Sequence, residues 1–194
     1  MNLPNKLTLM RIVMTPMFMA AMMIDFPHHY LVALILFALA SITDALDGHI
    51  ARKYNLITNF GKFMDPLADK MLTTAAFIAF LAKGFGIGME WVLFLVLFRE
   101  FAVSALRLVV VSSKSQKVIA ANIWGKMKTV SQMVTLIAGM ALMYYLDTIN
   151  PGDAAMFATM ELIFSIMIWI STLLAVISGI IYMKDSWDCI DPSK

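Results

Sequence analysis

Residues 30–53 read YLVALILFALASITDALDGHIARK, and this stretch decides the fold. An apolar run from Tyr30 to Ile42 leads directly into two aspartates, Asp44 and Asp47. A membrane helix needs about 20 apolar residues to cross a hydrocarbon core roughly 30 Å thick. At about 1.5 Å per residue, a helix that enters at Tyr30 has risen roughly 20 Å when it reaches Asp44. The stretch therefore predicts a membrane helix whose carboxylates lie inside the bilayer.

Apolar stretches of similar length lie on both sides of this one. They are Leu7–Ile24, Phe63–Leu81, Trp91–Ser112, Trp124–Leu146 and Ala155–Met183. Of the 194 residues, 61% are apolar and 14% are charged, whereas soluble domains have about 45–50% apolar and about 25% charged residues. The sequence predicts an all-α, polytopic membrane protein with six transmembrane helices. Residues 1–184 are expected to form one catalytic domain, and residues 185–194 a polar tail.

Basic residues are distributed unevenly among the segments between these stretches. They precede or open the first helix, follow the last, and lie in or beside segments 54–62 and 113–123, whereas the opposite breaks contain only Lys83. By the positive-inside rule, this pattern places both termini in the cytoplasm. The formal net charge of +2 is too small to indicate a nucleic-acid partner. Cys189 is the single cysteine, which excludes an internal disulfide and a metal–thiolate cluster.

A second aspartate pair, Asp65 and Asp69, opens the helix that runs back through the membrane. We therefore expect both pairs at a similar depth in an antiparallel hairpin. Asp44 and Asp47 are three residues apart and Asp65 and Asp69 are four apart, so each pair shares one helix face. Pro66 leaves two possibilities open: it occupies the first helical position after an Asp65 cap, or it interrupts a helix that began earlier.

Four carboxylates on facing helices repel one another strongly in a medium of low dielectric constant. An oxygen-only ligand set suits hard cations such as Mg²⁺ or Mn²⁺. Two divalent ions would neutralise the four charges and would suit two-metal phosphoryl chemistry. Two other interpretations stay open: a cation-coupled transporter with a carboxylate relay, and a set of interhelical salt bridges. The basic residues available for such bridges are Arg52, Lys53, Lys62 and Lys70.

Two glycines adjoin the aspartate pairs: Gly48 follows the first pair, and Gly61 precedes the second. A glycine lets a flat ligand approach the backbone closely, although close helix packing would use the same residue. Arg52 follows Asp44 by eight residues, so it lies slightly more than two turns along a nearby helix face. From there it could bind a diphosphate held at the metals.

Residues 44–69 contain D-A-L-D-G-H-I-A-R, eight further residues, and G-K-F-M-D-P-L-A-D. This segment resembles the signature of the CDP-alcohol phosphotransferase family, D-x2-D-G-x2-A-R-x8-G-x3-D-x3-D. The matching positions are Asp44, Asp47, Gly48, Ala51, Arg52, Gly61, Asp65 and Asp69. The resemblance implies a six-helix membrane architecture, a CDP-linked lipid donor, dependence on divalent metals, and a homodimer.

The same resemblance implies roles for individual residues. The metal ligands would be Asp44, Asp47, Asp65 and Asp69. The residues against the CDP group would be Gly48, Arg52 and Gly61. Asp69 would in addition take the proton from the acceptor hydroxyl. No serine, cysteine or histidine stands at a fixed position of the signature, so direct displacement is favoured over a covalent intermediate.

Three further patches resemble one branch of the family, the bacterial phosphatidylglycerophosphate synthases. They are Pro4-Asn5-Lys6-Leu7-Thr8 with Arg11, Arg99-Glu100 with Ser104 and Leu106-Arg107, and Gly125-Lys126-Met127-Lys128-Thr129 with Gln132. This likeness implies glycerol 3-phosphate as the acceptor, a dianion that requires fixed cations. The candidates are Arg99, Arg107, Lys126 and Lys128. The lysines also fit ordinary cytoplasmic-side residues, and Arg99 also fits a salt bridge with Glu100.

The resemblance as a whole implies an enzyme of phospholipid biosynthesis in the bacterial inner membrane, with its active site facing the cytoplasm. It would convert CDP-diacylglycerol and glycerol 3-phosphate into phosphatidylglycerophosphate and CMP. Other acceptors within the family stay open, namely inositol phosphate, serine or phosphatidylglycerol. Release of CMP would separate such an enzyme from a carrier or channel.

Overall fold

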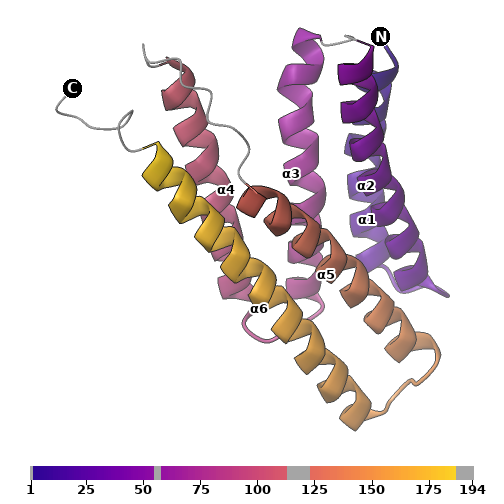
Figure 1. The fold of residues 1–194 in the computed structure, drawn as a ribbon. Helices are drawn as coiled ribbons and strands as arrows, with labels where there is room; N and C mark the ends of the chain where they lie inside the picture. The colour runs from indigo at the N-terminus through magenta and orange to yellow at the C-terminus, as the bar shows by residue number, and fades with distance from the viewer. Residues whose placement is uncertain (1, 55–57, 113–122, 187–194) are drawn as a thin grey trace.

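The computed structural model describes residues 2–54, 58–112 and 123–186. Within these ranges the chain forms α1 (Leu3–Met23), α2 (His29–Lys53), α3 (Asn59–Ala82), α4 (Met89–Ser112), α5 (Ile123–Thr148) and α6 (Ala154–Asp185). Successive helices run in opposite directions, so the start of α1 and the end of α6 lie at the same end of the bundle (Figure 1). The predicted order of apolar helices is confirmed.

Two helices begin about one turn earlier than predicted because polar side chains cap them. The side chain of Asn2 accepts a hydrogen bond from the Asn5 amide at 3.2 Å, and α1 therefore starts at Leu3. At the start of α3, the Thr58 hydroxyl oxygen accepts a hydrogen bond from the Gly61 amide at 3.0 Å. Such side-chain acceptors satisfy amides that have no partner inside the helix. As a result Pro66 lies within α3, the second of the two possibilities that the sequence left open.

The helices pack as two groups that are joined by contacts of α5 with α2 and of α4 with α3. On one side α1 contacts both α2 and α3, and on the other α4 and α5 contact α6. Helix α5 also contacts α2, and it lies between the two groups in Figure 1. The ends of α2, α4 and α6 lie together with the starts of α1, α3 and α5. We call this the aspartate end, and the opposite one the turn end.

The core near the turn end is aromatic. The ring of Phe164 lies 4.6 Å from that of Phe80 and 5.1 Å from that of Phe85, measured between centroids. All three side chains are buried. A Cβ atom at Gly139 would come within 2.5 Å of the Phe164 ring, so only glycine lets Phe164 pack on the α5 backbone. Buried aromatic contacts of this kind contribute strongly to packing.

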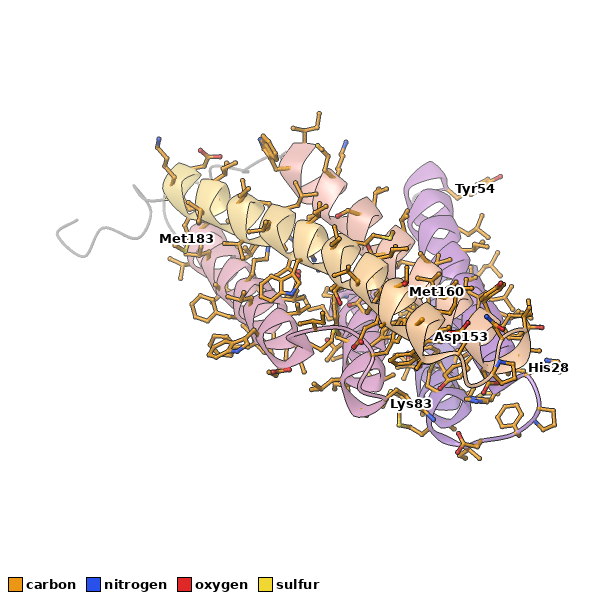
Figure 2. All side chains as sticks on the ribbon, turned by 90° about the horizontal axis from the view of Figure 1, so that it is seen from below. His28, Tyr54, Lys83, Asp153, Met160 and Met183 are labelled. Atoms are coloured by element: carbon orange, nitrogen blue, oxygen red, sulfur yellow. The ribbon has the colours of Figure 1, made fainter. Side chains whose placement is uncertain are left out.

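Short turns close this end between α1 and α2, α3 and α4, and α5 and α6. His28, Lys83 and Asp153 mark these turns in Figure 2. Lys83 forms an ion pair with Asp25 at 3.1 Å, and the Asp25 side chain is 84% exposed. Exposed pairs of this kind contribute about 0–1 kcal/mol. The turn end is therefore held mainly by its apolar core.

Among the described residues, three helices are long and apolar enough to cross a membrane: α1, α5 and α6. Helix α2 offers the shorter apolar segment His29–Asp44. Helices α3 and α4 carry charged residues near or within their apolar stretches, including Asp65 on α3 and Arg99 and Glu100 on α4. Their composition is therefore less typical of a membrane-spanning helix. The helices with the weaker membrane signal are thus α2 and α3, which carry the four predicted aspartates, and α4, which carries Arg99 and Arg107. The outward surface of α4 is still strongly apolar, as Phe98 and Phe101 are 63% and 68% exposed.

Candidate active site

Asp44 of α2 is held by a cation from α1. The Nη1 atom of Arg11 lies 2.5 Å from Asp44 Oδ1, with side-chain exposures of 1% for Arg11 and 40% for Asp44. A buried guanidinium is costly unless an anion is close by, and Asp44 supplies that anion. The carboxylate itself stays partly open. This partner differs from the four basic residues that the sequence suggested for salt bridges.

Asp65 of α3 is also held by α1. The Thr8 hydroxyl donates a hydrogen bond to Asp65 Oδ1 at 2.8 Å. Thr8 is 1% exposed, whereas Asp65 is exposed. Thr8 and Arg11 are three residues apart, about 4.5 Å along a helix axis. Because one turn of α1 touches both aspartates, Asp44 and Asp65 lie at a similar depth, as the sequence predicted for the two pairs.

A third α1 residue supports the start of α3. The Oδ1 atom of Asn5 accepts a hydrogen bond from the Thr58 hydroxyl at 3.0 Å. A Cβ atom at Gly61 would lie 3.1 Å from this Oδ1 atom and 3.6 Å from Asp65 Oδ2. Close packing, one of the two roles considered for Gly61, is therefore observed. Contact between Gly61 and a CDP group stays a prediction.

The remaining residues of the signature lie on the same two helices. Asp47, Gly48 and Arg52 belong to α2, and Asp69 belongs to α3. Their side chains lie outside the described residues. Among the residues that are described, no group of three possible metal-ligating side chains is found, and that search does not include Asp47 or Asp69. The predicted four-carboxylate cluster stays a prediction.

A second charged group joins α4 and α5. Glu100 Oε1 accepts a hydrogen bond from Arg99 Nη1 at 2.9 Å and another from Lys128 Nζ. Arg99 Nη2 donates to Ser178 of α6 at 2.7 Å. Arg99 and Lys128 were both predicted to bind the acceptor, and the structure brings them together on one carboxylate. The salt bridge between Arg99 and Glu100, considered as the other interpretation, is present.

The Arg99 side chain packs against the backbone of α6 at Gly179. A Cβ atom at Gly179 would come within 2.9 Å of Arg99 Cγ, so glycine makes room for the arginine stem. The Arg99 and Glu100 side chains are 13% and 19% exposed, and the Lys128 side chain is 10% exposed. We call Arg99, Lys128 and the Glu100 carboxylate that they share the basic cluster.

The basic cluster is connected to the aspartate helices. Lys70, the residue after Asp69, donates a hydrogen bond to the Ser104 hydroxyl, and Ser104 donates to the Glu100 carbonyl at 2.7 Å. On the other side of the bundle, the Ser41 hydroxyl of α2 lies 3.7 Å from Met133 Sδ of α5. These contacts bring α4 and α5 against the two helices that carry the aspartates.

The other two predicted acceptor residues lie outside this cluster. The guanidinium of Arg107 lies over the Tyr182 ring, 5.8 Å from its centroid, and Arg107 is exposed. Lys126 is also exposed, at the start of α5. The structure therefore separates the four predicted cations into a largely covered pair, Arg99 and Lys128, and an exposed pair, Arg107 and Lys126.

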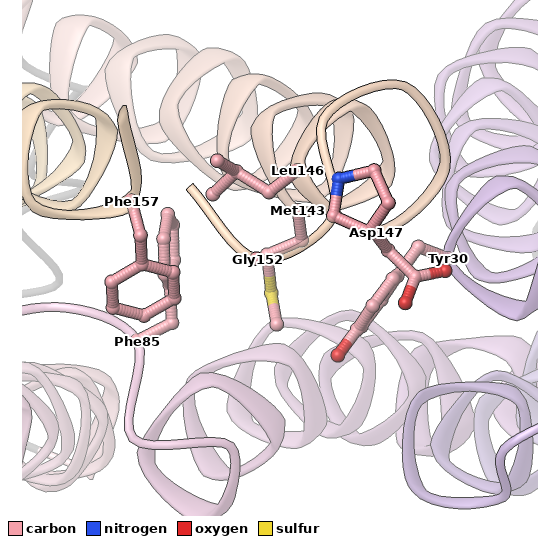
Figure 3. Close-up of a pocket in the computed structure, with 8 residues that line it drawn as sticks. Tyr30, Phe85, Met143, Leu146, Asp147, Gly152 and Phe157 are labelled. Carbon is pink, nitrogen blue, oxygen red and sulfur yellow. The ribbon is translucent and has the colours of Figure 1, made fainter. Parts of the chain in front are cut away.

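A pocket opens at the turn end, between α2, α5 and α6 (Figure 3). Tyr30, Phe85, Asp147 and Phe157 are among its lining residues. Tyr30 precedes Asp44 by fourteen residues on α2, a rise of about 21 Å. The pocket is therefore remote from the aspartates.

No role was predicted from the sequence for Asn5, Thr8 or Arg11. They follow one another at intervals of three residues in α1, so each lies near the next on the helix surface. All three are buried in spite of their polar side chains. The signal that could have identified them was their spacing of three residues within the first of the three patches quoted from the sequence, Pro4-Asn5-Lys6-Leu7-Thr8 with Arg11.

Comparisons with known proteins agree in the family that they indicate. A family model described as CDP-alcohol phosphatidyltransferase matches residues 1–181. The chain is similar to the CDP-diacylglycerol–glycerol-3-phosphate 3-phosphatidyltransferase of Bacillus subtilis (strain 168), with 39% identity over an alignment of 205 positions that covers 100% of this chain and 99% of the relative.

Two further relatives bear the same name. The protein of Rickettsia bellii (strain RML369-C) is 38% identical over 183 residues, which cover 94% of each chain. The protein of Haemophilus influenzae is 33% identical over 135 residues, which cover 70% of this chain and 73% of the relative.

Proposed function

The chain belongs to the CDP-alcohol phosphatidyltransferase family, and on this premise we propose that it transfers a phosphatidyl group from CDP-diacylglycerol to glycerol 3-phosphate. The products are phosphatidylglycerophosphate and CMP, in phospholipid biosynthesis. The names of relatives that match the chain over its length support this activity. The structural observation that carries it is the pair of partly open carboxylates, Asp44 and Asp65, held at one end of the bundle.

Members of this family generally depend on divalent metal ions, and the described residues fit such a group. Asp44 and Asp65 offer carboxylate oxygens from two adjacent helices, and hard divalent cations favour oxygen ligands. The proposed ligands are Asp44, Asp47, Asp65 and Asp69, and the proposed ions are two Mg²⁺ or Mn²⁺. When bound, such ions neutralise charge on the diphosphate and on the departing CMP.

The chain's own residues then have distinct roles. Asp69 accepts the proton of the acceptor hydroxyl, as a positioned general base. The hydroxyl oxygen attacks the lipid-side phosphorus, and the bond from that phosphorus to the CMP oxygen breaks. Arg52 binds the diphosphate, while Gly48 and Gly61 lie against the CDP group. Because the signature offers no nucleophile, one displacement with inversion at phosphorus is proposed.

The basic cluster is the proposed site for the acceptor phosphate. Arg99, Lys128 and nearby Lys70 outnumber the single carboxylate of Glu100, so the cluster keeps an excess of positive charge for a dianion. Charge-assisted hydrogen bonds are the stronger ones. The exposed Arg107 and Lys126 are proposed to line the path by which the acceptor arrives. The hydrogen bond between Lys70 and Ser104 places this region next to the aspartate helix α3.

We also propose six membrane-spanning helices, with both termini and the active site on the cytoplasmic side of a bacterial inner membrane. Three helices that are long and apolar enough to cross a membrane support insertion into a bilayer, and the placement of basic residues supports the orientation. The lipid donor would then reach the site from the bilayer, and the acceptor would reach it from the cytoplasm. A homodimer is proposed from the family resemblance.

The test is an assay of CMP release by purified protein, with CDP-diacylglycerol and a panel of alcohols. Glycerol 3-phosphate should be the best acceptor, and chelation of divalent metals should abolish the reaction until Mg²⁺ or Mn²⁺ is restored. Glycerol lacks the phosphate, and two lost charge-assisted contacts at about 1.5–3 kcal/mol each should lower its specificity by roughly two to four orders of magnitude. A reaction without any alcohol measures background hydrolysis.

The outcomes separate the parts of the proposal. A preference for serine, inositol phosphate or phosphatidylglycerol would reject the acceptor and leave phosphatidyl transfer standing. Full activity in excess chelator would reject the metal site. If no alcohol caused release of CMP, the enzyme assignment itself would be wrong, and a carrier would become the better explanation.

A further inference from the structure

Helix α1 presents three buried polar residues toward the aspartate helices. Asn5 contacts Thr58 at the start of α3, Thr8 contacts Asp65, and Arg11 contacts Asp44. We propose that Thr8 is a positioning residue, whose hydroxyl fixes the orientation of the Asp65 carboxylate for metal binding. This inference rests on the proposed function, because it takes Asp65 as a metal ligand.

The Thr8 hydroxyl has a single proton to donate. Its acceptors among the described residues include Asp65 Oδ1 at 2.8 Å and the Pro4 carbonyl oxygen at 3.1 Å. A hydrogen bond to an ionised carboxylate is stronger than one to a neutral carbonyl, and it is typically shorter. Of these two oxygens, the Asp65 carboxylate oxygen is therefore the stronger acceptor, and the Pro4 carbonyl oxygen is the weaker one.

The Thr8 hydroxyl is held rigidly. Thr8 is 1% exposed, and a β-branched side chain in a helix has few χ1 rotamers. Asn5 and Arg11 bind α3 and α2 one turn to either side, so α1 cannot easily shift away from the aspartates. The hydroxyl is thus held at a fixed place before any ligand arrives.

The contact with Thr8 orients the Asp65 carboxylate. Asp65 is exposed and could otherwise sample several orientations. With Oδ1 held by Thr8, Oδ2 is turned toward Gly61, 3.6 Å from where a Cβ atom of that residue would stand. Partners that orient a ligating carboxylate typically change metal affinity by about 10- to 100-fold when they are removed.

The same helix offers a matched control. Thr15 lies two turns further along α1, is 4% exposed, and donates its hydroxyl proton to the Arg11 carbonyl at 2.9 Å. It therefore resembles Thr8 in residue type, helix and burial. It differs in having only a backbone oxygen as its recorded hydrogen-bond acceptor, whereas Thr8 has a carboxylate as well.

The experiment measures Mn²⁺ binding to the purified full chain by electron paramagnetic resonance, without substrates. Thr8→Val, which keeps the shape and removes the hydroxyl, should weaken Mn²⁺ binding by about 10- to 100-fold. Thr8→Ser restores the donor, and its Mn²⁺ affinity should stay within about threefold of that of the unmodified protein, well below the 10- to 100-fold loss expected without the hydroxyl. Thr15→Val should bind Mn²⁺ as the unmodified protein does. The Mn²⁺ concentration for half-maximal CMP release should follow the same order.

A second substitution guards against failure to fold. If Thr8→Val does not give folded protein, Thr8→Ala carries the same expectation of weakened Mn²⁺ binding. Asp65→Asn separates the two proposals. Unchanged Mn²⁺ binding in Thr8→Val or Thr8→Ala, with a loss in Asp65→Asn, overturns the role of Thr8 alone. Unchanged binding in Asp65→Asn rejects Asp65 as a ligand, and with it both this inference and that part of the proposed function.

Discussion

The two ends of the bundle are built from the same helices by opposite means. At the turn end, Phe80, Phe85 and Phe164 pack against one another, and the charged residue Lys83 pairs with an aspartate at the surface. At the aspartate end, Arg11 is 0% exposed and pairs with Asp44. The basic cluster on α4 and α5 is likewise largely covered.

The difference separates residues that stabilise the fold from residues that are proposed to take part in the reaction. Burial of aromatic surface lowers the free energy of the folded state directly. Burial of charge does so weakly or not at all, because desolvation offsets the attraction within each pair. Buried charges that stability does not require are expected where function requires them. The comparison therefore predicts large effects on turnover at one end and large effects on stability at the other.

The largest expected effect is on turnover at the aspartate end. Asp69→Asn keeps the size of the side chain and removes the basic oxygen, so turnover should fall by about 10²- to 10⁴-fold. The measurement is CMP release at saturating concentrations of both substrates and metal. A change that more metal fully reverses would reassign Asp69 as a ligand only, and near-normal turnover would contradict both roles.

Phe164→Ala should give the converse result at the turn end. Removal of a buried phenylalanine from a packed core costs about 3–5 kcal/mol, and Phe164 contacts both Phe80 and Phe85. Thermal unfolding in detergent should show the loss of stability, while turnover of the protein that remains folded should stay near normal. If turnover fell in proportion at low temperature, the two ends would not be independent.

A smaller effect is expected for acceptor binding at the basic cluster. Lys128→Met keeps the length of the side chain but removes the charged hydrogen bond that Lys128 is proposed to donate to the acceptor phosphate. At about 1.5–3 kcal/mol for such a bond, the KM for glycerol 3-phosphate should rise roughly 10- to 100-fold. The KM for CDP-diacylglycerol should not change.

Arg52→Ala is the matched reverse of that experiment, because it should raise the KM for CDP-diacylglycerol and spare the acceptor. An exposed cation offers a further comparison: Arg107→Ala should weaken use of glycerol 3-phosphate without lowering stability. If Lys128→Met altered only yield or membrane insertion, the lysine would serve orientation in the membrane and not the acceptor.

The smallest effect is expected at the surface of the turn end. Lys83→Ala removes the ion pair with Asp25, whose side chain is 84% exposed. The change in the free energy of unfolding should stay below about 1 kcal/mol, with no change in either KM. A loss of activity at this position would show that the turn end communicates with the aspartates.

Several features of the site could be predicted from the sequence because they depend on neighbouring residues. The spacing of Asp44 and Asp47, and of Asp65 and Asp69, places each pair on one helix face whatever the rest of the chain does. The start of α3 was predicted too late, at Phe63, because the cap by Thr58 competed with the signal from Pro66. A hydroxyl cap that satisfies the first amides of the helix outweighed a proline that the helix can tolerate.

The sequence by itself determined the class of protein, the order of the helices and the carriers of the charges. These follow from the length of each apolar stretch and from spacings within single helices, which are local properties. Only the tertiary structure decided which groups meet: Arg11 with Asp44, Lys128 with Glu100, and Thr8 with Asp65, the last pair 57 residues apart in the chain. Such contacts depend on how each helix is rotated about its axis and against which neighbour it packs. That choice is made by the packing of all the helices together, and no short stretch of sequence contains it.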